Sequence, residues 1–379
     1  MKKIILLLIL ILVVSTSVFA NLDIKPLSFD PIYEAYNSSL WSTKLRFQYL
    51  MLLNESGPDS VLVSTPYDSS KHYHNETEET KKYDYVYDTM NFRTPGSGQT
   101  SYLRLSSGLN VGICKVSYES DNLPTIQAEF SLQGSLNTVF ESAGSTDLLG
   151  FDGVYFLGLN LGVGDMFTLR AGIHHYSSHY GDEIIESVYE YGDNKDKLLA
   201  DNDSTIILNY VRQNAIVVGA SLKPTSWIRF YSEVNALPKN LLRIRPGIFA
   251  PDSTENKEGS NTQVGEVYPS EGNPGGRLTP YGNGYFNMRF NAGVELNYDV
   301  PLLGELVFGY DIELIQEGQT KYQVGAYSPN NPWDIEHNIS VSQKIGDDLA
   351  LDVIFHSGRF PLNNLYNFNC KFVSIGFSI

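Results

Sequence analysis

Three histidines and two serines fall within the segment His174-His175-Tyr176-Ser177-Ser178-His179. Residues 167–180 are predicted to form a β-strand, in which alternate side chains point to opposite faces of the sheet. His175, Ser177 and His179 therefore share one face with Leu169 and Ile173. Because His175 and Ser177 project side by side, the imidazole can accept the hydroxyl proton and make Ser177 a nucleophile toward an ester. The residue types thus indicate a candidate hydrolase pair.

A catalytic histidine also needs a third group that fixes its orientation. On the next predicted strand, residues 205–222, Ile216 and Val218 lie on the apolar face, and the same parity puts Asn214 on that face. Asn214 is the simplest candidate for the third group, and Asp182 and Glu183 in the following loop are alternatives. A polar cluster that only stabilises a loop at the rim explains the same residues without catalysis.

Metal binding is another interpretation of this segment. His179, Asp182 and Glu183 are the candidate ligands, because imidazole and carboxylate groups together suit a zinc-like ion. His175 could join His179 only if the end of the strand curls, since strand residues four apart are separated by about 13 Å. No cofactor follows with certainty from these residues, and calcium is the one candidate.

The elements that must position these residues are recognised by strict alternation of apolar and polar side chains. In residues 286–300, eight apolar positions from Phe286 to Val300 alternate with asparagine, arginine, glycine and acidic positions. Fifteen residues of alternation exceed the usual soluble strand, and the polar face is too charged for the inside of a soluble sandwich. The apolar face is therefore predicted to contact lipid and the polar face to line the interior of a barrel.

Twelve segments carry this pattern, so the fold class is predicted as an all-β, antiparallel transmembrane β-barrel of about 12 strands. They are residues 43–53, 102–118, 125–140, 153–164, 167–180, 205–222, 226–237, 285–300, 304–316, 334–345, 349–358 and 367–379. The connections alternate between short and long, as expected for periplasmic turns and extracellular loops. Both termini are then periplasmic, and the His-Ser segment lies at the external rim.

The start of the chain predicts export. Lys2 and Lys3 precede an apolar run and a small-residue site ending at Ala20, which is typical of a cleaved signal peptide. We therefore expect a signal peptide at 1–20, a periplasmic entry segment at 21–42 and the barrel at 43–379, in the outer membrane of a Gram-negative bacterium. Cys114 and Cys370 are the only cysteines, so one bridge or two free thiols are the alternatives.

The net charge of the chain and the charges at its inward positions bear on its partners and on whether the lumen is open. A net charge of -16 argues against nucleic acid as a partner. The inward positions carry both signs, so ion pairs could plug the lumen, and a narrow diffusion pore is the alternative. The inward positions are Arg170, Arg229, Arg289, Glu129, Glu233, Glu295, Asp299, Asp311, Glu313 and Asp352.

The segment His175-Tyr176-Ser177 resembles the His-x-Ser pair of outer-membrane phospholipase A and lipid A 3-O-deacylase, families of 12- and 8-stranded barrels that carry this pair on the lipid-facing wall. Those families continue with Asn, whereas this chain has Ser178. The closing alternation, residues 372–379, resembles the signal that the barrel-assembly machinery reads. The resemblances imply outer-membrane lipids and that machinery as partners.

A wider resemblance is to an outer-membrane barrel family known as a conserved domain of unknown function. Its His-x-Ser-Ser-His-x-Gly-Asp-Glu element matches residues 175–183, and residues 26–31 and 208–212 also look like family elements. This resemblance implies the barrel and no activity. The function is accordingly predicted as an outer-membrane barrel protein of unassigned activity, with a lipid ester hydrolase and a narrow pore as alternatives.

Overall fold

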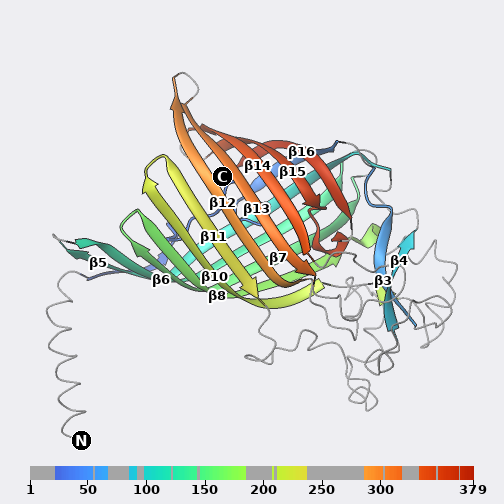
Figure 1. The fold of residues 1–379 in the computed structure, drawn as a ribbon, viewed down its shortest axis with the longest axis horizontal. Coiled ribbons are helices and arrows are strands. Elements are labelled where there is room, and N and C mark those ends of the chain that lie inside the picture. The colour runs from blue at the N-terminus through green and yellow to red at the C-terminus, as the bar shows by residue number, and fades with distance from the viewer. Residues whose placement is uncertain are drawn as a thin grey trace, which may run out of the picture.

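The computed structural model shows twelve antiparallel strands that close into one barrel (Figure 1). It describes residues 22–53, 56–66, 85–91, 98–120, 123–142, 146–184, 207–208, 211–236, 286–301, 304–317, 333–346, 349–366 and 368–379. The predicted signal peptide, 1–20, lies outside the described residues. The barrel strands are β2 (Arg46–Leu52), β5 (Ser101–Ser120), β6 (Leu123–Glu141), β7 (Leu148–Val163), β8 (Phe167–Tyr180), β10 (Val211–Thr225), β11 (Ile228–Ala236), β12 (Phe286–Val300), β13 (Gly304–Glu317), β14 (Trp333–Ile345), β15 (Leu349–Arg359) and β16 (Asn369–Ser378).

The barrel closes where the first and last of these strands meet. β16 pairs with β2 over seven residue pairs, from Phe372 with Leu52 to Ser378 with Arg46, and β2 in turn pairs with β5. Every neighbouring pair is antiparallel, so the predicted fold class and strand number are confirmed. Closure leaves each barrel strand hydrogen-bonded on both sides, which a membrane requires because lipid cannot satisfy backbone groups.

The side-chain alternation explains why the barrel faces lipid. On β7 the outward residues Tyr155, Leu157, Leu159 and Leu161 are 45–57% exposed, although all are large and apolar. The inward positions of the same wall are buried and include polar residues such as Asn160. This inside-out distribution is that of a membrane-spanning barrel. No helix among the described residues is long and apolar enough to cross a membrane.

Short turns and long connections lie at opposite ends of the barrel. β10 and β11 join through residues 226–227, and β14 and β15 through residues 346–348, whereas β11 and β12 are separated by residues 237–285. The start of β2 and the end of β16 lie together at the short-turn end. The assignment of that end to the periplasm stays a prediction. Cys114 and Cys370 are both free thiols.

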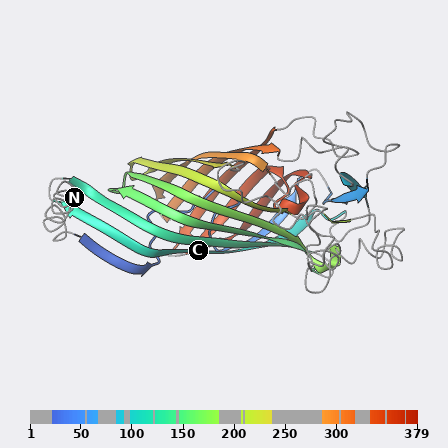
Figure 2. The same ribbon diagram turned by 90° about the horizontal axis from the view of Figure 1, so that it is seen from below.

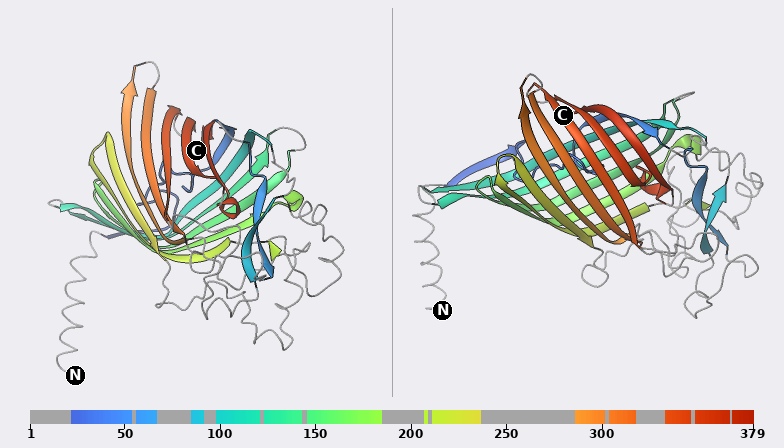
Figure 3. Two further views of the ribbon diagram at one scale, coloured as in Figure 1. Left: turned by 45° about the vertical axis from the view of Figure 1, so that its right-hand side comes forward. Right: turned by 45° about the horizontal axis from the view of Figure 1, so that its top comes forward.

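Two smaller sheet regions extend the barrel. β1 (Leu22–Ser28) pairs with the second half of β5, and Figure 2 shows these strands with β6 reaching beyond the other strands at the short-turn end. At the opposite end, β3 (Ser60–Pro66), β4 (Tyr85–Asn91) and β9 (Ile207–Leu208) form a separate three-stranded sheet (Figure 3). The long connection between β2 and β5 therefore contributes a hairpin outside the barrel.

Residues 30–44 run between β1 and β2 and pack against inward-facing barrel side chains; we call them the inserted segment. Its Tyr33, Tyr36, Leu40 and Trp41 are buried, and its backbone accepts hydrogen bonds from barrel arginines such as Arg46. The expected periplasmic location of residues 21–42 stays a prediction. Most of the inserted segment nevertheless contacts the lumen side of the barrel wall.

Candidate active site on the outer wall

The predicted His-Ser pair lies on the outer wall of the barrel. β8 keeps regular alternation from Phe167 to Tyr180, so His174, Tyr176 and Ser178 are buried on the lumen side. His175 and Ser177 are half-buried on the opposite, lipid-facing side. The parity predicted from the sequence is therefore correct for this strand.

Asn214 lies directly beside His175. The register of β8 with β10 pairs the two residues, and His175 Nδ1 lies 2.8 Å from Asn214 Oδ1. An amide oxygen can only accept, so the hydrogen bond requires the proton on Nδ1 and leaves Nε2 with a free lone pair. The geometry thus holds the imidazole in the tautomer that a general base needs.

The opposite neighbour of Ser177 is a glycine that its hydroxyl packs against. On β7 the paired residue is Gly153, and Ser177 Oγ lies only 3.0 Å from the point where a Cβ of Gly153 would be. Next to it, Tyr155 pairs with His175, with their ring centroids 6.0 Å apart. A side chain at position 153 would press against the Ser177 hydroxyl and the Tyr155 ring, so a glycine here leaves room for both.

Ser177 and His175 share a face without a direct hydrogen bond. None of the hydrogen bonds among the described residues joins them. Residues two apart on a strand are separated by about 6.6 Å along the chain, so contact depends on the side-chain rotamers. Catalytic hydrogen bonds of this type commonly tighten only when substrate is bound.

The predicted metal ligands do not come together. Among the residues that the structure describes, no group of three or more His, Cys, Asp or Glu side chains could hold a metal ion. His179 remains on the extended strand and stacks on Phe151, with ring centroids 4.7 Å apart, while Asp182 and Glu183 begin a helical turn beyond it. This geometry gives no support to the metal hypothesis for His179, Asp182 and Glu183, which stays a prediction.

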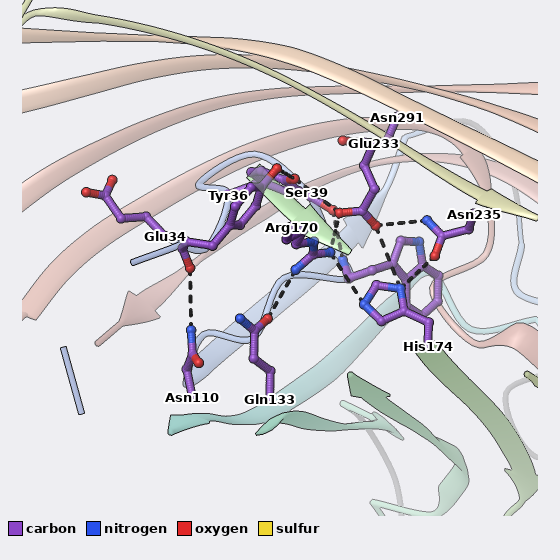
Figure 4. Close-up of polar contacts among 12 residues, drawn as sticks. Glu34, Tyr36, Ser39, Asn110, Gln133, Arg170, His174, Glu233, Asn235 and Asn291 are labelled. Carbon is purple, nitrogen blue, oxygen red and sulfur yellow. Dashed lines mark hydrogen bonds and ion pairs between the residues drawn. The ribbon is translucent and has the colours of Figure 1, made fainter. Parts of the chain in front are cut away.

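The lumen behind this wall is filled by a polar network (Figure 4). Arg170 contacts Glu233 as an ion pair and donates a 3.1 Å hydrogen bond to Gln133 Oε1. His174 Nδ1 lies 2.7 Å from Asn235 Oδ1. The buried charges are therefore paired with opposite charges, as the low-dielectric interior requires.

The inserted segment completes this filling. Tyr36 donates a 3.2 Å hydrogen bond to Glu233, and the Asn37 backbone N–H donates a 2.6 Å bond to Glu295. Arg46 donates to the carbonyl oxygens of Asn37 and Ser39 at 2.6 and 2.8 Å. The cavity left between the segment and β8 has a volume of about 50 Å³, enough for a few water molecules. The predicted plugging of the lumen by ion pairs is thus supported for the described part of the barrel, and a narrow pore stays a prediction.

Charged groups also gather where the inserted segment meets the short-turn end. Burial lowers the pKa of Lys44 to about 8, and the neighbouring Arg46 charge acts in the same direction. Burial would raise the pKa of Glu34, but its 2.5 Å hydrogen bond from Lys223 and the charge of Arg229 outweigh that effect and lower it. Both pKa shifts reflect charged side chains that lie close together, and the nearby cations keep the Glu34 carboxylate ionised.

Similarity to this chain is found among solved structures. No protein-family model matches the sequence, and no curated protein sequence matches it. Among solved structures, outer membrane phospholipase A from Escherichia coli is 9% identical, with a TM-score of 0.43 over 89% of this chain and 92% of that chain. The Salmonella typhi outer membrane phospholipase dimer with bound calcium is 9% identical, with a TM-score of 0.41 over 89% and 90%. A Pseudomonas aeruginosa FadL homologue is 8% identical, with a TM-score of 0.29 over 89% and 88%.

No residue role is carried over from these proteins, and the resemblance to a domain of unknown function stays a prediction. What the sequence reasoning missed at this site is the pair formed by Gly153 and Tyr155 on β7, which the register places beside Ser177 and His175. A closed twelve-stranded barrel with an apolar wall and a polar, filled interior is the structure of an integral outer-membrane protein. The chain is therefore an integral outer-membrane β-barrel protein.

Proposed function

We propose that this barrel is an outer-membrane lipid ester hydrolase that uses Ser177, His175 and Asn214. The observation that carries the proposal is the 2.8 Å hydrogen bond between His175 and Asn214, on the same outward face as Ser177. The three residue types are those of a nucleophile, a base and an orienting group, and all three lie on one face, with the base hydrogen-bonded to the orienting group. A cluster that only stabilises the rim would not need all three on the lipid-facing side.

The proposed ester hydrolysis uses the His175 tautomer that carries its proton on Nδ1. Ser177 Oγ attacks the carbonyl carbon of an ester while His175 Nε2 accepts the hydroxyl proton, and the same proton then passes to the leaving alkoxide. The acyl group remains on Ser177 until a water molecule, deprotonated by His175, releases it as a carboxylic acid. Asn214 holds the ring in place throughout, and as a neutral amide it supplies orientation without a full counter-charge.

The position of the site selects the substrate class. Ser177 lies three residues from the end of β8 that leads into a long connection, so it faces lipid near one membrane surface. An ester at that depth belongs to a membrane lipid, either a glycerophospholipid or the acylated sugar of lipid A. A soluble ester would have to enter from the bilayer to reach the same hydroxyl.

The test is ester cleavage by the refolded mature chain in detergent, with phospholipid and lipopolysaccharide as separate substrates, each with and without calcium. Ser177→Ala and His175→Ala should abolish release of fatty acid while heat-modifiable migration is unchanged. Ser232→Ala is the matched control, because Ser232 is an outward serine on β11, away from the histidine. Absence of activity in the wild type under every condition, or full activity in Ser177→Ala, would refute the proposal.

A further inference from the structure

A second group of polar residues crosses the outer wall on β14, β15 and β16. The strand registers pair His337 with Ser357, and Ser357 with Lys371, so the three residues form one transverse row. The row continues on β13, where Tyr310 OH lies 2.9 Å from His337 Nδ1. All four side chains lie on the outward face, most of whose other positions on these strands are apolar.

This row is independent of the candidate active site. Going round the barrel, β10, β11, β12, β13 and β14 separate β8 from β15 on one side, and β16, β2, β5, β6 and β7 separate them on the other. The two groups therefore occupy opposite walls. Ser357 lies two residues from the end of β15 that leads away from the short turns, so the row is near the same membrane surface as Ser177.

Lys371 gives the row its charge. Among the outward positions of β14, β15 and β16, it is the one exposed Lys, Arg, Asp or Glu, since Arg359 at the end of β15 is buried. No acidic side chain among the described residues forms an ion pair with it. A cation on the lipid-facing wall of a barrel is costly at the bilayer centre and is tolerated near the interface, where the ammonium group can reach the headgroups.

The surface around Lys371 is hollowed. A groove of about 360 Å³ runs across the three strands, and it is lined by Trp333, Ile335, Ser357, Asn369 and Lys371. Ser357 and Gly358 are small, so they form the floor between the larger side chains. Asp334 also lines the groove, but Arg359 pairs with its carboxylate at 2.5 Å and neutralises it. The groove thus presents a cation, a hydroxyl, an amide and an indole to the membrane.

We propose that this groove binds the phosphate-bearing headgroup of an anionic membrane lipid. Lys371 would form the charge-assisted contact with the phosphate, and the Ser357 hydroxyl would donate a second hydrogen bond. The Trp333 ring would lie beside the glycerol or sugar region, as interfacial aromatic residues do. The occupant is a lipid because the groove opens onto the apolar outer wall, with Ile335 beside the polar groups to contact its acyl chains.

The three tryptophans of the chain, Trp41, Trp227 and Trp333, make a direct test possible. In a Trp41→Phe/Trp227→Phe variant, Trp333 is the remaining tryptophan, so the fluorescence of the protein comes from the groove. It is reconstituted in phosphatidylcholine vesicles with a small fraction of a lipid brominated near the carboxyl end of its acyl chains, either phosphatidylglycerol or phosphatidylcholine. Contact with bromine quenches the indole. From the quenching, we expect the groove to bind the anionic lipid with an association constant about tenfold above that for phosphatidylcholine. A hydrogen bond to a charged group contributes about this factor to binding.

Lys371→Gln in the same background should make the two brominated lipids equally effective, whereas Lys371→Arg should keep the preference. Lys344→Gln, which removes a lysine from the lumen side of β14, is the matched control and should leave the preference unchanged. Unlabelled lipid A should compete with the brominated lipid, and inorganic phosphate should not, which separates a headgroup from a free ion. Equal quenching in the unmodified background, or an anionic preference that survives Lys371→Gln, would overturn the proposal.

Discussion

The hydrogen bond between His175 and Asn214 allows the size of the rate loss in Asn214→Ala to be predicted. In triads with a carboxylate as the third group, its loss lowers the rate by about four orders of magnitude, because the histidine loses both its correct tautomer and the charge that stabilises the imidazolium. Asn214 is neutral and makes one hydrogen bond at 2.8 Å. A neutral hydrogen bond contributes about 0.5–1.5 kcal/mol, which corresponds to a rate factor of about 2 to 12.

We therefore expect Asn214→Ala to lower kcat/KM for phospholipid by about tenfold or less, and Ser177→Ala to abolish turnover. The assay is the initial rate of fatty-acid release in mixed micelles, with the fraction of folded barrel fixed by heat-modifiable migration. Ser232→Ala serves as control for an outward substitution and should retain the full rate.

Two results would refute this reasoning. A loss of a thousandfold or more in Asn214→Ala would mean that the residue does more than orient His175, for example by contacting the substrate. An unchanged kcat/KM would mean that the hydrogen bond is not used in the reaction, even if Ser177 and His175 are essential.

Three further predictions concern the filled lumen. Glu233→Gln should lower the free energy of unfolding by about 3 kcal/mol, measured in urea with the barrel in lipid vesicles, because Arg170 stays buried without its counter-charge; an unchanged midpoint would contradict this. Arg46→Met should release the inserted segment and give a measurable conductance in planar bilayers, since its hydrogen bonds to that segment are lost; a barrel as closed as the wild type would show that other contacts suffice. Asp152→Ala removes the carboxylate that accepts the first backbone N–H of the 3-10 helix η4 (Asn363–Leu365) at 2.9 Å. It should speed proteolysis at that helix severalfold while the barrel stays resistant, and equal cleavage rates would contradict the assigned role.

The barrel could be predicted from the sequence because alternation of side chains is a local property. Each strand carries its own two-residue period, and the twelve predicted segments agree with the observed strands to within a few residues at most ends. The placement of Asn214 beside His175 also followed from parity, since neighbouring antiparallel strands share their outward faces. Roles for these residues stay predictions until activity is measured.

The position of the inserted segment and the geometry around His179 could not be predicted from alternation. Residues 30–44 have no regular period, and their burial depends on contacts with distant side chains such as Glu233 and Glu295. Binding of one metal ion by both His175 and His179 was predicted to require a bend at the end of β8. The backbone instead remains extended to Tyr180.

The pairing of β2 with β16 has a consequence for the order of assembly. Leu52 meets Phe372 across this seam, so almost the whole chain must be made before the two edges can join. Contacts between residues so far apart in sequence form slowly, because the chain entropy is lost before the contact is gained. The inserted segment immediately precedes β2, so it must enter the interior while that seam is still open. Closure of the seam would then trap the segment, and we expect the last step of biogenesis to be the one that seals the lumen.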